Sequence, residues 1–225
     1  LNLEQLRLGH RDLKRKTRLD IATFIISRVC RGLEYAHTKT DARGRPLSIV
    51  HRDVSPKNSL INTEGECKLT DFGIAKARNY MEQDEERVLM GKVEYMSPEQ
   101  ADYRITDASS DLFSLGIVYS ELLTGNNGFV GTDTNDTLDM VKRAELPDLK
   151  KDRPDLPPEI IKIVTKALQK DPMQRYQTAT DMVYDLEYQM YSRGYGPTIA
   201  SFAKYTAELF PKHNFAASKR TPLNS

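Results

Sequence analysis

Three short polar motifs follow one another in a fixed order, and they constrain the fold of this chain more than any other feature. The segment His51-Arg52-Asp53 is followed by Asn58, five residues after the aspartate. Asp71-Phe72-Gly73 begins eighteen residues after Asp53, and Ser97-Pro98-Glu99 comes later in the chain. A lone Asp-Phe-Gly carries no information, but the ordered set at these spacings is highly specific.

The hydrophobic pattern predicts a mostly helical chain with one small hairpin. Apolar residues recur at helical spacing in four stretches. These predicted helices are Asp20–His37, Ser109–Thr124, Glu159–Gln169 and Thr178–Tyr191. The second is apolar on most sides, which predicts a central helix. Two β-like runs, Ser59–Asn62 and Cys67–Thr70, flank a turn at Glu64-Gly65 and predict the hairpin.

Composition excludes several classes of protein. The chain has 33 Lys and Arg against 32 Asp and Glu, a net charge of +1 that does not favour nucleic-acid binding. Its longest apolar runs are far shorter than the roughly 18 residues of a membrane span, so we expect no membrane segment in this chain. Cys30 and Cys67 lie in apolar patterns without metal-binding spacing, which predicts reduced, buried thiols and a cytoplasmic protein.

The ordered motifs resemble those of the protein kinase superfamily, and the resemblance runs from roughly Leu19 to Tyr188. It implies ATP and Mg²⁺ as cofactors and a protein as the substrate. By this resemblance, Asp53 would accept or orient the proton of the substrate hydroxyl, while Asn58 and Asp71 would bind Mg²⁺ through oxygen. Leu60 would lie beneath the adenine ring.

The same resemblance implies supporting roles for residues of the scaffold and of regulation. These residues are His51, Arg52, Phe72, Gly73, Glu99, Asp111 and Arg175. Arg52 would bind an activating phosphate, and Asp111 would bond the backbone of the catalytic loop. Glu99 would pair with Arg175 in a buried ion pair that braces the substrate platform.

A complete protein kinase begins with a β-rich small lobe that clamps ATP through a glycine-rich loop and a strand lysine. Nothing resembling these features precedes Leu19. We therefore expect a mainly α fold, a kinase-like C-terminal (large) lobe without the N-terminal β-lobe. The predicted divisions are this lobe at 1–195, an extra amphipathic helix at 196–210 and a disordered tail at 211–225. This chain alone is expected to bind ATP poorly.

The charge beside the γ-phosphate departs from the family pattern. Serine/threonine kinases usually carry lysine two residues after the catalytic aspartate, and threonine just after the glycine of the substrate loop. Here these positions hold Ser55 and Lys92. We hypothesise that Lys92 supplies the positive charge that Ser55 cannot. Lys57 is the rival donor, and a Lys92 side chain in solvent is the third possibility.

The segment between Gly73 and Ser97 contains no serine or threonine, so the usual activating phosphosite is absent from it. Its hydroxyls belong to Tyr80 and Tyr95, and an acidic cluster within it is formed by Glu82, Asp84, Glu85 and Glu86. We hypothesise that one of these carboxylates binds Arg52 in place of a phosphate, with less charge. The alternative is a solvated acidic turn.

A second His-Arg-Asp stands at His10-Arg11-Asp12, but Thr17 replaces the required asparagine. No Asp-Phe-Gly follows it at the right distance. Its basic neighbours predict a solvated helix face, and the first eighteen residues resemble the helix that follows the kinase hinge.

Phrases such as Glu34-Tyr35-Ala36-His37 and Gly44-Arg45-Pro46-Leu47 resemble bacterial eukaryotic-type serine/threonine kinases. The leading prediction is a bacterial signalling kinase that transfers the γ-phosphoryl group of ATP to protein hydroxyls. The alternative is a truncated, non-catalytic binding module. A small-molecule kinase fits less well, because such enzymes usually lack the Ser97-Pro98-Glu99 segment. The oligomeric state stays open.

Overall fold

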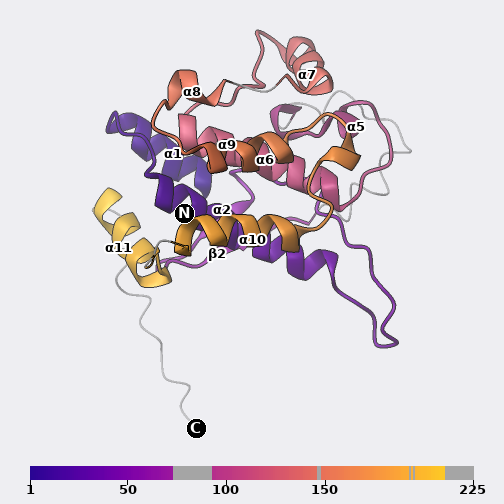
Figure 1. Ribbon diagram of the computed structural model, residues 1–225, viewed down its shortest axis with the longest axis horizontal. Helices are drawn as coiled ribbons and strands as arrows, with labels where there is room; N and C mark the ends of the chain where they lie inside the picture. The colour runs from indigo at the N-terminus through magenta and orange to yellow at the C-terminus, as the bar shows by residue number, and fades with distance from the viewer. Residues whose placement is uncertain (73–92, 146–147, 193, 195, 211–225) are drawn as a thin grey trace.

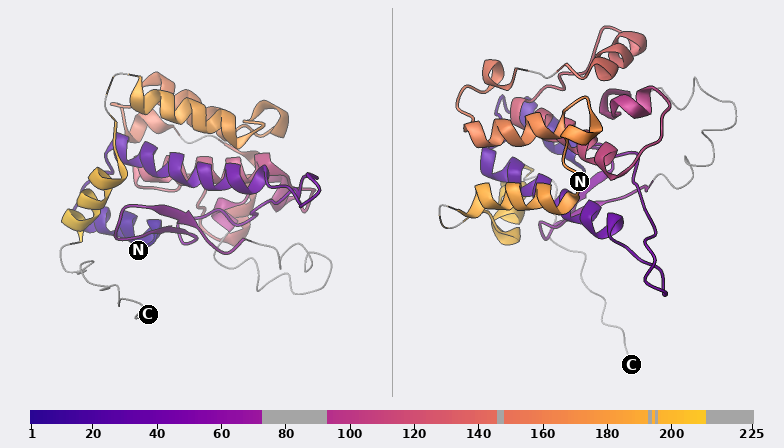
Figure 2. Two further views of the ribbon diagram at one scale, coloured as in Figure 1. Left: turned by 90° about the horizontal axis from the view of Figure 1, so that it is seen from below. Right: turned by 45° about the vertical axis from the view of Figure 1, so that its right-hand side comes forward.

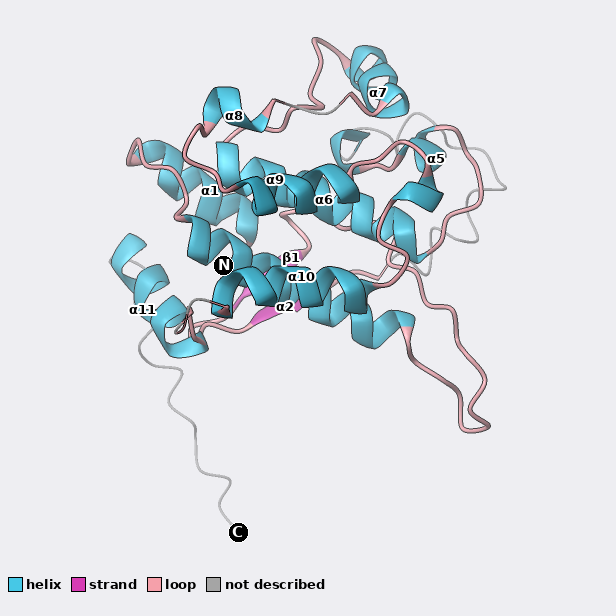
Figure 3. Ribbon diagram, in the orientation of Figure 1, coloured by secondary structure: helices cyan, strands magenta, loops and turns pink. Residues whose placement is uncertain are grey.

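The computed structural model describes residues 1–72, 93–145, 148–192, 194 and 196–210. Within this part the protein is mainly α-helical with one two-stranded antiparallel sheet, which confirms the predicted fold class (Figures 1 and 3). The helices are α1 (Leu3–Asp12), α2 (Leu19–His37), α5 (Pro98–Ala101), α6 (Ala108–Thr124), α7 (Thr134–Arg143), α8 (Leu149–Asp152), α9 (Pro158–Ala167), α10 (Ala179–Tyr191) and α11 (Ile199–Leu209). The strands are β1 (Ser59–Ile61) and β2 (Cys67–Leu69), and two 3₁₀ turns are η1 (Val93–Tyr95) and η2 (Pro172–Gln174).

The four helices predicted from periodicity are α2, α6, α9 and α10, each within two residues of its expected ends. The hairpin is β1 and β2, and the extra helix predicted in 196–210 is α11. Helices α5, α7 and α8 were not predicted: α5 and α8 have only four residues each, and α7 is largely polar, with Leu138, Met140 and Val141 as its apolar residues. Side-chain caps mark their starts instead: the Ser97 hydroxyl begins α5, and the Asp133 carboxylate begins α7.

Helix α6 occupies the centre of the lobe, as its apolar circumference predicted (Figure 1). It packs against α2 and α9, and nearly all of its side chains are buried. The Asp107 carboxylate accepts a hydrogen bond from the Ser109 N–H at 2.8 Å and fixes the start of the helix. Gly125 ends it in the left-handed region at φ 87°. The fixed start matters because Asp111 stands in the first turn.

The hairpin lies on α2, and α10 runs along another side of the same helix (Figure 2). Ser59 lies opposite Leu69 in the antiparallel register, and Ile61 lies opposite Cys67. The turn between the strands needs the positive φ of 82° that Gly65 adopts. Strand β1 begins at Ser59, directly after the segment 51–58, which we call the catalytic loop. The packing of the hairpin on α2 therefore also fixes the end of that loop.

Helix α1 lies next to β1, and Asn2, which caps the start of this helix, forms a β-bridge with Leu60 of that strand. Arg11 and Asp12 are exposed, as the predicted solvated face requires. His10 is buried, with 4% of its surface accessible, so the prediction was wrong for this residue. The cause is a contact with α11, which the local sequence does not reveal.

Both cysteines are free thiols, with Cys30 buried and Cys67 half-buried. Burial raises the pKa of each thiol, that of Cys67 to about 12, so both remain protonated at neutral pH. In the described ranges, no helix combines the length and the apolar content that a bilayer crossing demands.

Candidate active site

The carboxylate of Asp111 holds the backbone of the catalytic loop. Its two oxygens accept hydrogen bonds from the N–H groups of His51 and Arg52, each at 2.8 Å. His37, at the end of α2, places its Nε2 2.8 Å from the same carboxylate. Arg52 adopts a φ of 61°, a left-handed conformation that is rare outside glycine. The buried carboxylate stabilises this conformation by satisfying both amides.

The ring of His51 joins the catalytic loop to the Asp71-Phe72 segment. Its Nε2 lies 3.0 Å from the Thr70 carbonyl oxygen, and its Nδ1 accepts the Asp53 N–H at 3.3 Å. These partners require the neutral tautomer with the proton on Nε2. The Phe72 ring packs on it with centroids 4.4 Å apart. His51 is fully buried, so the two loops share one rigid contact.

Asn58 is bound to the residue predicted as the base. Its side-chain amide donates to the Asp53 carbonyl oxygen at 2.8 Å, and its backbone N–H donates to the Ser55 carbonyl at 3.2 Å. The first bond uses Nδ2 as the donor and so fixes the side-chain amide, whose Oδ1 is an acceptor. Asp71 is exposed and has a φ of 59°, a second left-handed backbone beside the loop.

Asn58 and Asp71 offer the oxygen donors that Mg²⁺ prefers. No group of three or more His, Cys, Asp or Glu gathers as a metal cage within the described ranges. Mg²⁺ usually binds one or two protein oxygens together with substrate phosphates and waters, so a sparse donor set fits this ion. The exposed Asp71 carboxylate and the hydrogen-bonded Asn58 amide are compatible with such a site.

Leu60 presents an exposed apolar side chain on β1. It is 40% exposed, whereas its strand neighbours Ser59 and Ile61 are 1% and 2% exposed. The alternation arises because successive side chains of a strand point to opposite faces. An exposed leucine in the middle of a buried strand is suited to contact a flat apolar ligand.

Glu99 and Arg175 form a buried, bidentate ion pair, as the resemblance implied. Their two contacts are 2.8 and 2.9 Å, and the Ser110 hydroxyl donates to Glu99 at 2.6 Å. Burial alone would raise the pKa of Glu99, but the hydrogen bonds from Arg175 and Ser110 outweigh it, so the pKa lies below its ordinary value. The guanidinium also lies over the Phe113 ring, 4.7 Å from its centroid.

Of the three residues that bear on the charge beside the γ-phosphate, Ser55 and Lys57 belong to the described part of the chain and Lys92 does not. Ser55 is buried, and its hydroxyl has no hydrogen-bond partner among the described residues. Lys57 points towards α1, where its Nζ lies 3.7 Å from the Glu4 carboxylate. Gly73 and Lys92 lie outside the described residues, so the choice between Lys92 and Lys57 stays a prediction.

Arg52 joins the catalytic loop to α5 and to the segment between α5 and α6. Its Nε donates to the Thr106 hydroxyl at 2.9 Å, and its carbonyl accepts the Gln100 amide at 3.0 Å. The acidic residues 82–86, which we expect to meet this guanidinium, fall outside the described part of the chain. Their pairing with Arg52 therefore stays a prediction.

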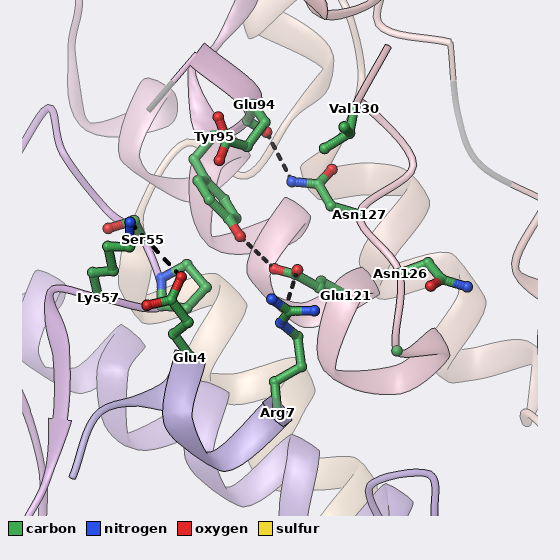
Figure 4. Close-up of a pocket in the computed structure, with 12 residues that line it drawn as sticks. Glu4, Arg7, Ser55, Lys57, Glu94, Tyr95, Glu121, Asn126, Asn127 and Val130 are labelled. Atoms are coloured by element: carbon green, nitrogen blue, oxygen red, sulfur yellow. Dashed lines mark hydrogen bonds and ion pairs between the residues drawn. The ribbon is translucent and has the colours of Figure 1, made fainter. Parts of the chain in front are cut away.

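A pocket of about 310 Å³ opens beside the catalytic loop (Figure 4). Charged and polar side chains from α1, the loop, η1 and α6 line it, among them Glu4, Arg7, Lys57, Glu94, Tyr95 and Glu121. At its base the Tyr95 hydroxyl donates to Glu121 at 2.6 Å, and Arg7 lies 3.2 Å from the same carboxylate. Burial raises the pKa of Glu121, although Tyr95 and Arg7 oppose the shift.

Sequence reasoning missed Glu4, Arg7 and Glu121 as lining residues. Each stands alone on a helix as an ordinary charged residue, and more than a hundred positions separate Arg7 from Glu121. The apolar stripe of α6 did contain one signal, because a glutamate inside a buried helix requires a partner.

Comparison with known proteins shows which family and which proteins this chain resembles. The family model for the protein kinase domain matches residues 4–186. The tyrosine-protein kinase MasK of Myxococcus xanthus is 37% identical over 169 residues, covering 75% of this chain and 26% of that protein. The serine/threonine-protein kinase PrkC of Bacillus subtilis is 40% identical over 146 residues, covering 65% and 22%. The serine/threonine-protein kinase PknB of Mycolicibacterium smegmatis is 37% identical over 167 residues, covering 72% and 25%. The chain thus spans about a quarter of the length of these relatives.

Proposed function

Because the chain belongs to the protein kinase family, we propose that it is the catalytic large lobe of an enzyme that phosphorylates proteins with ATP. The observation that carries the proposal is the bond from the Asn58 amide to the Asp53 carbonyl, in a loop held by Asp111. It joins the residue for proton transfer and a residue for metal binding in one fixed unit.

In the proposed reaction, the Asp53 carboxylate orients the substrate hydroxyl and accepts its proton. The hydroxyl oxygen forms a bond to the γ-phosphorus of ATP, the bond from that phosphorus to the β–γ bridging oxygen breaks, and ADP leaves. Asn58 and Asp71 would hold Mg²⁺, which neutralises phosphate charge when bound. Leu60 would support the adenine ring.

We further propose that serine or threonine is the accepting residue. Two of the relatives above are named serine/threonine-protein kinases, and one is named a tyrosine-protein kinase. The phrase Val54-Ser55-Pro56 and the substrate loop lack the usual sequence of the tyrosine class. Peptides that differ only in serine, threonine or tyrosine as the acceptor, offered to the full gene product, would decide between these classes.

The proposal also requires a clamp over the ATP phosphates, for which this chain has no glycine-rich loop or strand lysine. We propose that residues upstream of Leu1 in the gene supply it. Calorimetry with ATP and Mg²⁺ on this chain and on an upstream-extended version tests this idea. We expect binding by the extended version, whereas equal and weak binding by both would favour a non-catalytic module.

Two substitutions in the extended protein separate binding from transfer. Asp71→Ala removes a magnesium ligand and is expected to abolish binding of the ATP–Mg²⁺ complex. Asp53→Asn keeps the size of the side chain but cannot accept the proton, so nucleotide binding should persist while kcat falls about 10²–10⁴-fold. Unchanged phosphotransfer in Asp53→Asn would remove this residue from the mechanism.

A further inference from the structure

Helix α11 lies beyond the residues that match the protein kinase domain, yet it is packed into the lobe. The match ends at residue 186, and α11 covers Ile199–Leu209. Phe202 is fully buried, and its ring lies 5.5 Å from the ring of Phe24 on α2. Thr206, one turn further along, is 3% exposed. A fully buried aromatic side chain anchors a helix through the apolar surface that it removes from water.

Two glycines of the lobe lie where α11 comes closest. A Cβ atom at Gly65, in the hairpin turn, would overlap the Ile199 carbonyl oxygen and lie 2.9 Å from the Ala203 backbone nitrogen. A Cβ atom at Gly9, within α1, would lie 2.6 Å from the Phe210 ring. Glycine is unfavourable inside a helix, so its presence in α1 requires a reason. The approach of Phe210 supplies one.

A specific polar contact joins α11 to α1. The Nδ1 of His10 lies 2.8 Å from the Leu6 carbonyl oxygen, so Nδ1 carries the proton and donates it. The Nε2 of the same ring is therefore an acceptor, and the Tyr205 hydroxyl donates to it. The two rings also stack, with centroids 5.7 Å apart. The contact accounts for the burial of His10 that the local sequence failed to predict.

Helix α1 in turn supports β1, the strand that carries Leu60. The Leu1 carbonyl accepts the Ile61 N–H at 2.7 Å, and the Leu3 N–H donates to the Pro56 carbonyl at 3.1 Å. Helix α11 therefore contacts both supports of β1: α1 at one end and the hairpin turn at the other. Figure 1 shows α11 beside α1, and the left view of Figure 2 shows it at the same end of the lobe as the hairpin.

We propose that α11 is a positioning element of the active site. It holds α1 and the hairpin turn in place, and it thereby fixes Leu60 as the surface for the adenine ring. The role of Leu60 rests on the proposed function, whereas the clamp on α1 does not. Asp53 is held from the side of Asp111, and α1 reaches its loop only at Pro56 and Lys57, so we expect α11 to affect nucleotide binding more than the phosphoryl-transfer step.

Hydrogen exchange on this chain tests the clamp. Tyr205→Phe removes only the hydroxyl that binds His10, and Phe202→Ala removes the ring that packs against Phe24. Both should speed amide exchange in α1 and in residues 59–69. Val183→Ala, a buried truncation on α10, is the matched control and should leave these two segments at wild-type rates. Should Phe202→Ala fail to fold, Tyr205→Phe still decides. Equal exchange of α1 in Tyr205→Phe and wild type would overturn the clamp.

Steady-state kinetics on the full gene product test the positioning role. The loss of one buried hydrogen bond predicts that Tyr205→Phe raises the KM for ATP about three- to tenfold, with kcat within about twofold. Val183→Ala should change neither constant. Faster exchange in α1 with an unchanged KM would leave α11 a structural brace and overturn the positioning role. A wild-type protein that fails to bind ATP would refute the proposed function, while the exchange result would still decide the clamp.

Discussion

At the scale of single residues, Asp111 fixes several parts of the site at once. Its carboxylate binds two successive amides of the catalytic loop and the ring of His37 at the end of α2. These groups come from two segments, and Asp111 itself stands on a third, more than fifty residues further along the chain. One buried side chain on a central helix can therefore set the conformation of the loop that contains Asp53, the proposed base.

We expect Asp111→Ala to destabilise the lobe by about 2–5 kcal/mol, because the buried N–H groups of His51 and Arg52 lose their acceptor. Asp111→Asn keeps one acceptor oxygen and should cost clearly less. Urea unfolding measures both differences. Hydrogen exchange at residues 51 and 52 should accelerate in the alanine variant, and a stability within about 0.5 kcal/mol of wild type would contradict the role of the carboxylate.

Removing the cation should cost more stability in the buried Glu99–Arg175 pair than in an exposed ion pair. Arg175→Met leaves a buried carboxylate without its cation and should cost about 3–5 kcal/mol of stability. Arg104→Met is the matched control: it removes an exposed cation that pairs with Asp102 at 2.9 Å, and it should cost less than about 1 kcal/mol. Chemical denaturation of both variants checks the prediction, which fails if the two costs are equal.

The same pair makes stability depend on pH in a predictable direction. The folded-state pKa of Glu99 lies below its ordinary value of 4.5. Its contribution is therefore fully present above about pH 4.5 and is lost as the pH falls through the lowered folded value. Urea midpoints measured from pH 6 to pH 3 should fall less steeply in Glu99→Gln than in wild type. Parallel curves would show that Glu99 does not titrate with folding.

At the scale of elements, the contact between α1 and α11 should also respond to pH. Burial lowers the pKa of His10, the Leu6 carbonyl opposes this shift and Arg15 adds to it. Neutral His10 accepts the Tyr205 hydrogen bond, whereas a protonated Nε2 cannot. Because the folded pKa lies below 6.5, the stabilisation is complete above about pH 6.5 and declines as the pH falls below it.

Hydrogen exchange of α1 at pH 7.5 and pH 5.5, corrected for intrinsic rates, checks this expectation. Opening of α1 should be more frequent at the lower pH in wild type. Tyr205→Phe should show a smaller difference, because the bond is already absent. Arg18 and Asp20 also act electrostatically on Tyr205, so Arg18→Gln serves as a control for charge alone. An equal pH response in wild type and Tyr205→Phe would exclude the His10 contact as its source.

The packing of α6 on α9 gives a further prediction at this scale. A Cβ atom at Gly116 would lie 2.8 Å from the Cβ of Ala167 and 3.1 Å from the Leu168 side chain. Gly116→Ala should therefore destabilise the lobe by about 1–3 kcal/mol, although alanine favours helices. Adding Ala167→Gly restores the space and should recover part of the loss. Thermal unfolding of the single and double variants measures the recovery, and its absence would place the strain elsewhere.

At the scale of the whole molecule, the sequence predicted the features that repeat or that belong to a motif. Helical periodicity located α2, α6, α9 and α10, and the motif positions predicted the Glu99–Arg175 pair. It could not predict the Arg7–Glu121 pair or the burial of His10. These contacts join helices that are distant in the chain. The apolar setting of Glu121 shows that it needs a partner, but the local sequence does not say which residue that partner is. Only the packed arrangement brings them together.

The predicted division at residue 195 separates α11 from the lobe, yet the structure joins them through Phe202 and Tyr205. An amphipathic period shows that a helix has an apolar face, but it does not say which surface will cover that face. The boundary between lobe and extension was therefore the least predictable part of the organisation.

The burial of α6 has a consequence for synthesis of the protein on the ribosome. Helix α6 leaves the exit tunnel before α9 and α10 do, so its apolar sides first meet water instead of their final neighbours. Translation proceeds at about 5–20 residues per second, so this exposure lasts several seconds. During that interval a nascent chain in which α6 has left the tunnel and α9 has not is a ready ligand for chaperones, and a pause in translation at that stage would prolong its risk of aggregation.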